Sequence, residues 1–372
     1  MLACAVAWVR WMGLLAGVLV LSACQGAGSL APPQAPNGSQ AAQGPQAPSV
    51  QARVTFPAPL AWGGEARCSA GACKLVLVEH EAGQLVLHQF KGRSVVELDR
   101  KPLAYHPDSA KWITDDWVVA AVERGQSLDL FAVSEGRLTK HAQIVVPFAP
   151  RDVIVLSVQG GVSTLMATPY SGKDVAIVRW QQGANDAKVT PVHWCEAPWH
   201  PALVSRAPRG SGSGVIAACL DDKRVMYVSA KDWTAKPTEI ARFDRVARQV
   251  TPSPTGKWAY VALEIGPRNA RIDMDSGEVQ HLEAAPNGAV SVATLDDDTV
   301  VWGGPNSIYL QKFDAAGKVL ETRWLKPSGY PTGLQLIDLD GDGEKDLLVL
   351  NSAGQVADVF YGPIWARALG SL

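Results

Sequence analysis

The residues with the clearest potential for chemistry lie close together near the end of the sequence, in the run DLDGDGEKD at positions 338–346. The carboxylates of this run belong to Asp338, Asp340, Asp342 and Asp346. Glycines between them let the backbone turn tightly. Ca²⁺ takes about six to eight oxygen ligands, and four carboxylates this close repel one another unless a cation neutralises them. The spacing therefore predicts a calcium site, with a solvated acidic turn as the alternative.

The segments on either side of this loop are apolar and short, at 334–337 and 347–350, and both are typical of strands. A loop between two strands lies within a sheet, and the predicted ion would stabilise the fold there rather than take part in a reaction.

The rest of the chain repeats the same kind of strand. Seven apolar runs recur at 74–78, 117–121, 174–178, 224–228, 258–262, 299–303 and 346–350. Successive runs lie 34 to 57 residues apart, and the mean of about 45 matches the length of one propeller blade. In most of these units a second strand follows the first after a short and nearly constant number of residues. A turn that contains glycine often precedes a third strand.

A small antiparallel meander of this kind cannot cover both of its faces, whereas a closed ring of such units buries the faces and protects the edges. The sequence therefore predicts an all-β fold, a β-propeller of about seven four-stranded blades over residues 53–364, followed by a short tail at 365–372. Six or eight blades, or a pair of β-sandwiches, are the alternatives.

The segment 331–351 resembles one FG-GAP/VCBS repeat, the unit of integrin-α-like propellers, and the continuation through 354–360 fits as well. The resemblance implies that the four aspartates hold Ca²⁺ structurally and that the backbone carbonyl of Glu344 is a further ligand. The segment 253–262 resembles instead the repeat of YVTN or TolB-type propellers.

The first 52 residues predict export and anchoring. Residues 11–23 form an apolar stretch that is too short to span a bilayer and is typical of a signal peptide. The run LSAC at 21–24 resembles a bacterial lipoprotein box, which implies lipidation of Cys24 after removal of residues 1–23. A plain secretory signal is the alternative. Residues 24–52, rich in Ala, Gln, Pro and Gly, then form a disordered tether.

An acylated Cys24 would anchor the protein to a membrane of the bacterial cell envelope. Gln25 after the cysteine favours the outer membrane. The chain has 34 Lys and Arg residues against 36 Asp and Glu residues, a balance that argues against nucleic acid and against electrostatic membrane docking. The expected partner is a protein or a glycan of unknown identity.

Export makes disulfide bonds permissible. We expect Cys68 to pair with Cys73, and Cys195 with Cys219. The alternative for the second pair is a metal site of His193, Cys195, His200 and Cys219, although its spacing fits no familiar zinc pattern.

No nucleotide-binding loop, HExxH motif or GxSxG elbow is present in the sequence. The Trp-rich segment 194–200 could line a pocket at the mouth of the propeller, but a disulfide-pinned structural loop is the favoured interpretation. These observations predict no catalytic or cofactor-binding residues, and a non-enzymatic, calcium-stabilised, membrane-anchored binding scaffold. The alternatives are a propeller enzyme of the lactonase or quinoprotein type, which an apolar central cavity would dismiss, and an outer-membrane assembly factor.

Overall fold

The computed structural model describes residues 53–69, 71–208, 210, 212–266, 268–282 and 288–369. The predicted signal peptide at 1–23, the lipidated Cys24 and the tether at 24–52 lie outside the described residues, as do positions 370–372 of the predicted tail. The described residues belong to one compact unit. No helix within them is long and apolar enough to cross a bilayer.

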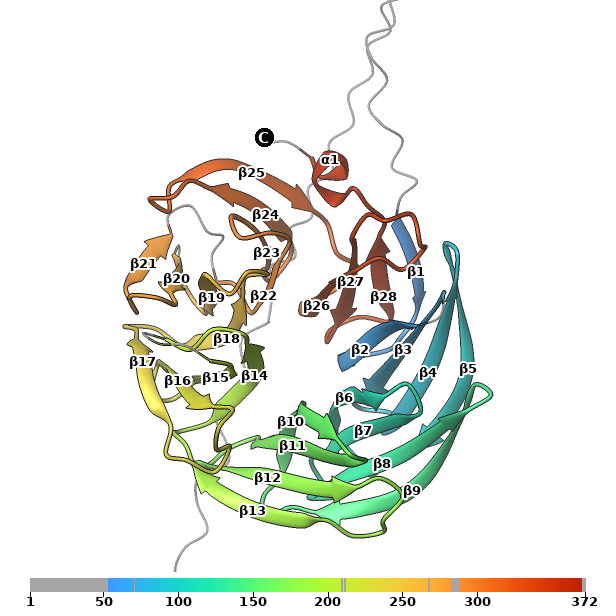
Figure 1. The fold of residues 1–372 in the computed structure, drawn as a ribbon. Coiled ribbons are helices and arrows are strands. Elements are labelled where there is room, and N and C mark those ends of the chain that lie inside the picture. Colours follow the sequence, from blue (N-terminus) through green and yellow to red (C-terminus); the bar gives the residue numbers. More distant parts are fainter. Residues whose placement is uncertain are drawn as a thin grey trace, which may run out of the picture. The chain divides into compact units, whose positions relative to one another are not determined.

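The described part of the chain forms seven four-stranded antiparallel sheets that stand around a central axis (Figure 1). The prediction of an all-β, seven-bladed propeller is confirmed. The first four blades contain β2 (Ala61–Ser69), β3 (Ala72–Glu79), β4 (Gln84–Lys91), β5 (Ser94–Pro102); β6 (Pro107–Thr114), β7 (Trp117–Val122), β8 (Ser127–Ser134), β9 (Arg137–Val145); β10 (Pro150–Gln159), β11 (Val162–Pro169), β12 (Asp174–Gln181), β13 (Lys188–His193); and β14 (Pro198–Val204), β15 (Gly214–Cys219), β16 (Arg224–Ser229), β17 (Thr238–Arg242).

The fifth and sixth blades contain β18 (Ala247–Pro252), β19 (Trp258–Leu263), β20 (Asn269–Asp273), β21 (Val279–Leu282); and β22 (Ser291–Thr294), β23 (Thr299–Gly303), β24 (Ile308–Phe313), β25 (Val319–Leu325). The seventh blade contains β26 (Pro331–Ile337), β27 (Asp346–Asn351), β28 (Val356–Phe360) and β1 (Arg53–Pro57), and the short helix α1 (Ile364–Arg367) follows it. The first strand of each group in the chain, from β2 to β26, is the innermost and faces the axis (Figure 1).

The uneven spacing of the seven predicted runs has a simple origin. Five of the runs lie in the second strand of their blade, but 174–178 and 224–228 lie in the third strands β12 and β16. Second and third strands are both central in their sheets and buried on both faces, so that both appear in the sequence as short continuous apolar runs. The two shifted anchors produce the steps of 57 and 34 residues.

The ring is closed by strands from opposite ends of the described chain. β1 pairs antiparallel with β28, with Arg53 opposite Phe360 and Pro57 opposite Val356. The seventh blade therefore cannot be completed until both segments are present, and this pairing removes two free sheet edges.

Apolar side chains between neighbouring blades make up the core. Trp258 and Tyr260 of the fifth blade pack against Trp302 and Phe313 of the sixth. Trp117 of the second blade meets Trp180 of the third edge to face, with ring centroids 4.9 Å apart. These aromatic contacts hold neighbouring blades together.

Candidate functional site

The inner strands depart from regular pairing at equivalent places. Six of the seven have a β-bulge near their first residues, where the register skips one or two positions. The skipped residues are Trp62 and Gly63 in β2, Asp108 in β6, Arg151 in β10, His200 and Pro201 in β14, Arg248 in β18 and Thr332 in β26. A bulge bends the strand and redirects its side chain. All of these residues line one cavity.

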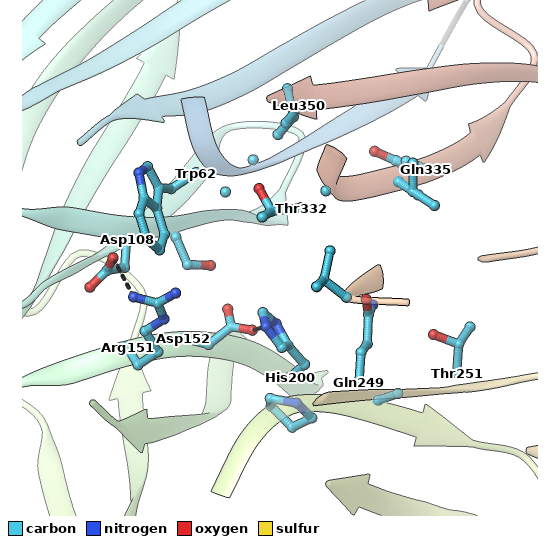
Figure 2. A pocket seen from close by; sticks show the side chains of 18 of the residues that line it. Trp62, Asp108, Arg151, Asp152, His200, Gln249, Thr251, Thr332, Gln335 and Leu350 are labelled. Carbon is cyan, nitrogen blue, oxygen red and sulfur yellow. Dashed lines mark hydrogen bonds and ion pairs between the residues drawn. The ribbon is translucent and has the colours of Figure 1, made fainter. Parts of the chain in front are cut away.

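This cavity, which we call the axial pocket, has a volume of about 150 Å³ and takes lining residues from all seven blades. Figure 2 shows side chains from several inner strands pointing into the same space. Three basic residues, Lys111, Arg151 and Arg248, and two acidic ones, Asp108 and Asp152, contribute to the lining. An apolar central cavity would have argued against a propeller enzyme, but the lining of this pocket is polar.

His200 and Asp152 form a pair in this pocket. Nδ1 of His200 lies 3.3 Å from Oδ2 of Asp152, as the dashed line in Figure 2 marks. Asp152 is held by its neighbours, since its Oδ1 also accepts a hydrogen bond from the N–H of Val153 at 2.8 Å. With Nδ1–H donating to the carboxylate, the lone pair of the neutral imidazole is on Nε2. The pair thus provides an oriented base.

The surroundings keep the two partners in the charge states that a base needs. Burial would raise the pKa of Asp152, but the hydrogen bond from His200, the charge of Lys111 and the Ser109 hydroxyl outweigh it and lower the pKa to about 2. Burial lowers the pKa of His200, and the charges of Arg151 and Arg248 add to this effect against the opposing influence of Asp152. At neutral pH, Asp152 is ionised and His200 is uncharged.

Two arginines are fixed next to this pair by aromatic rings. The guanidinium of Arg151 lies 4.5 Å from the ring centroids of both Trp62 and Trp199, and that of Arg248 lies 4.6 Å from Trp199. Arg151 is only 6% exposed, and its Nη1 donates to Oδ1 of Asp108 at 3.1 Å. Cation–π contacts and burial leave these side chains little freedom. They present fixed positive charge to an anion in the pocket.

The side chains of Trp199 and His200 are positioned by the segment that precedes them. Cys195 is bonded to Cys219, and the Trp199 indole N–H donates to the carbonyls of Pro169 and Tyr170, both at 3.2 Å. The disulfide pins this loop and its tryptophans pack in the core as expected, but interpreting His200 as merely structural missed its place in the pocket. The signal that could have found it was its position near the start of a first strand.

Both predicted disulfides are present, because Cys68 is likewise bonded to Cys73. The alternative metal site at the second pair is wrong, since two of its four ligands are bonded to each other. His193, a third, is exposed and pairs with Asp174 at 3.0 Å.

Two polar lining residues are already engaged in holding the ring. Gln335 of β26 accepts from the N–H of Ala66 and donates to its carbonyl, at 2.8 and 2.7 Å. Gln249 of β18 accepts from the N–H of Val292 at 3.1 Å. Each amide satisfies the backbone of the next inner strand, so these side chains belong to the scaffold of the pocket.

The predicted calcium loop lies apart from this site, between β26 and β27. Ligand oxygens of Asp338, Asp340 and Asp346 lie within 4.8 Å of one another. The Asp338 carboxylate accepts hydrogen bonds from the N–H groups of Gly341 and Gly343, at 2.7 and 3.0 Å, which curls the loop around it. Both glycines have positive φ, 81° and 87°, as the sequence requires for such a turn.

Three of the four predicted carboxylate ligands thus come together. Asp342 lies outside this group, and its Oδ1 accepts a hydrogen bond from the N–H of Glu344 at 2.9 Å. The backbone carbonyl of Glu344 stays a predicted ligand. A basic residue from the first blade also reaches the loop, since Nε of Arg93 lies 3.0 Å from Oδ2 of Asp340. Burial, with the charges of Asp340 and Asp342, raises the pKa of Asp346 despite two backbone hydrogen bonds. The donor set fits a hard cation.

Comparisons with known proteins place the fold among propellers. The structure is similar to virginiamycin B lyase from Staphylococcus aureus, with a TM-score of 0.60 and 12% identity, over 83% of this chain and 99% of that one. It is also similar to a candidate 6-phosphogluconolactonase from Bacteroides uniformis, with a TM-score of 0.55 and 18% identity, over 72% of this chain and 84% of that one. No family model and no curated protein matches the sequence, so the resemblance to FG-GAP repeats stays a prediction.

These findings correct one expectation. The prediction that the protein is not an enzyme is contradicted by the comparisons, because both similar propellers are named as enzymes and this architecture therefore does not argue against catalysis. The prediction rested on the architecture and on the lack of a recognisable motif. Propeller enzymes share this architecture, and here a polar pocket is assembled from residues spread over seven blades, which no short motif can reveal. At these identities the similarity itself establishes the fold alone.

Proposed function

We propose that the protein is an enzyme that opens the ring of a small lactone with water, and that the axial pocket is its active site. The observation that carries the proposal is the pair formed by His200 and Asp152, 3.3 Å apart, beside two immobilised arginines. The name of one of the two similar propellers, a candidate 6-phosphogluconolactonase, agrees with a reaction of this class, whereas the other is named as a lyase, an enzyme that cleaves bonds without water.

The reaction needs only groups that the pocket contains. Nε2 of His200 takes a proton from a water molecule while the water oxygen attacks the lactone carbonyl carbon, and Asp152 stabilises the resulting imidazolium. The negative charge that develops on the carbonyl oxygen is stabilised by a guanidinium, that of Arg151 or Arg248. The ring C–O bond then breaks, the imidazolium returns its proton to the leaving alkoxide, and a hydroxy acid is formed.

The size and charge of the pocket restrict the substrate. A cavity of about 150 Å³ accommodates roughly one six-membered ring. Three basic residues against two acidic ones favour a substrate or product with a negative charge. We therefore expect monocyclic lactones to be substrates, and those with an anionic substituent to have the lower KM.

A direct test is the hydrolysis of four lactones, γ-butyrolactone, δ-valerolactone, glucono-1,5-lactone and its 6-phosphate, followed by titration of the acid released at pH 7. We expect turnover above the buffer rate with at least one six-membered ring, and a lower KM for the phosphorylated sugar lactone than for the neutral one. Rates equal to buffer for all four compounds would contradict lactone chemistry at this site.

We also propose that Ca²⁺ binds the loop at 338–346 and stabilises the seventh blade, as the convergence of Asp338, Asp340 and Asp346 supports. Ca²⁺ at 100 times its Kd should add about 2.7 kcal/mol to the free energy of unfolding, which raises the melting temperature by roughly 4 °C for a unit of this size. Asp340→Ala should abolish the difference between calcium and chelator in a thermal melt. If the melting temperature of the wild type does not respond to chelator, the negative charge of the loop is neutralised by Arg93 without Ca²⁺.

The lipid anchor at Cys24 rests on the sequence alone. If present, it would hold this enzyme at the surface of a membrane of the bacterial cell envelope, with the tether at 24–52 as a spacer.

A further inference from the structure

A second group of titratable side chains lies beside the axial pocket and has no role in the proposed reaction. It consists of His80, which directly follows β3, Glu81 in the next turn, and His106, which directly precedes β6. One nitrogen or oxygen atom from each of these residues falls within 4.8 Å of the others. His80 is buried, His106 is half-buried and Glu81 is exposed. The group is therefore anchored on one side and open to solvent on the other.

The distances within this group fit an ion better than they fit hydrogen bonds. Nε2 of His80 lies 3.9 Å from one oxygen of Glu81, and Nε2 of His106 lies 3.9 Å from the other. Both distances are too long for a hydrogen bond. Ligands about 2.0–2.2 Å from a tetrahedral Zn²⁺ are roughly 3.3–3.5 Å apart. A small movement of the exposed Glu81 side chain reaches that spacing.

The opposite nitrogen of each ring faces a carboxylate. Nδ1 of His80 lies 3.2 Å from Oδ1 of Asp108 and 3.2 Å from the carbonyl of Pro107. Nδ1 of His106 lies 3.8 Å from Oε2 of Glu123. Metal-binding histidines donate their second N–H to such groups, which fixes the ring and leaves the lone pair on the ligating nitrogen. Here that lone pair falls on the two Nε2 atoms that face Glu81.

Neighbouring rings hold the two imidazoles in place. The ring centroid of His80 lies 4.6 Å from that of Trp62, on which it stacks, and 4.2 Å from that of His106. On the other side, the tilted ring of Tyr105 contacts His106 with centroids 3.9 Å apart, and its hydroxyl donates to Oε2 of Glu81 at 2.7 Å. All three candidate ligands are thus oriented by neighbours before any ion binds.

We propose that His80, Glu81 and His106 form a binding site for a divalent first-row transition metal of the Zn²⁺ type, with a fourth position open to water. Two histidines and a carboxylate are a ligand set that zinc accepts, and three protein ligands leave a coordination position free. The site is coupled to the axial pocket, because Oδ1 of Asp108 contacts both Nδ1 of His80 and Nη1 of Arg151. A bound ion would fix the carboxylate that positions Arg151.

The test is equilibrium binding of Zn²⁺ to the chain, purified without a polyhistidine tag, by isothermal calorimetry, with Co²⁺ as a spectroscopic probe. We expect one Zn²⁺ per chain and visible cobalt absorption typical of a low-coordinate site. Glu81→Gln and His106→Asn should each weaken Zn²⁺ binding by at least tenfold. Asparagine is chosen at 106 because this residue has a φ of 58°, which asparagine tolerates.

Two matched variants separate this site from other metal ligands. His193→Asn removes an exposed histidine that also faces a carboxylate, and Asp340→Ala alters the acidic loop, and neither should change zinc affinity. Equal zinc affinity in Glu81→Gln, His106→Asn and wild type would overturn the proposal, as would no saturable binding. The cluster would then be a set of ion pairs. Since the readout is metal binding, the result does not depend on whether lactones are substrates.

Discussion

Replacing His200 with asparagine is expected to lower kcat for lactone hydrolysis by roughly 10²–10⁴, the usual contribution of a general base, with a much smaller effect on KM. The substitution removes Nε2, the atom that takes the proton from water in the proposed reaction. Asparagine retains a polar side chain and tolerates the φ of 47° at this position. Steady-state kinetics on the best substrate of the four-lactone set provides the measurement.

The pH dependence of the wild-type enzyme checks the same assignment. Burial, aided by Arg151 and Arg248, lowers the pKa of His200 below the ordinary value of 6.5, and a base must be unprotonated to act. The value of kcat/KM should therefore be constant at neutral pH and fall only at pH values below 6.5. Asp152, with a pKa of about 2, stays ionised throughout this range.

The chain contains a matched control. Nδ1 of His193 lies 3.0 Å from Oδ1 of Asp174, so this pair has the chemistry of the first one but is exposed, at the facing ends of β12 and β13 in the third blade. His193→Asn should leave kcat and the pH profile unchanged. If His200→Asn retains wild-type kcat, or if the acid limb of the profile stays in that variant, His200 is not the base.

The fold could be predicted from the sequence because apolar strands of the same kind recur at a roughly regular spacing. Central strands buried on both faces recur at about the length of a blade, and a closed ring of such units buries them and protects their edges. The position of each run within its blade was less certain, since second and third strands bury the same kind of residue. Runs 174–178 and 224–228 were assigned one strand too early for this reason.

The axial pocket could not be predicted in the same way. Its residues are spread over the chain, from Trp62 in β2 to Leu350 in β27, and most of them meet because they lie on inner strands of different blades. Several of them, His200 and Arg151 included, also sit in β-bulges, where the strict alternation of strand residues fails. The acidic loop could be predicted because its four aspartates lie within one short run of the sequence, at 338–346. His200 was overlooked because its partner Asp152 comes from another blade.

Replacing Asp358 with asparagine should destabilise the propeller by about 3 kcal/mol, with a fall in melting temperature of roughly 5 °C. Asp358 is fully buried in β28. Its carboxylate accepts from Nε and Nη2 of Arg53 at 2.8 and 2.6 Å, from the backbone N–H of Ser328 at 2.8 Å and from Nδ2 of Asn351 at 2.9 Å. Asparagine has the same size, but its NH₂ group replaces one carboxylate oxygen. That group is a donor and would face the N–H donors that now bind Asp358.

The effect should be large because this carboxylate joins the two ends of the ring. Arg53 comes from β1 at the start of the described chain, whereas Ser328 and Asn351 come from its C-terminal part, so weakening the contact releases the strand that closes the propeller. Asp275→Asn is the matched control, since Asp275 pairs with Arg206 at 3.0 Å on the exposed surface, where such pairs contribute little. Thermal melts of both variants should differ clearly. Equal melting temperatures would mean that backbone pairing of β1 with β28 closes the ring without the help of Asp358.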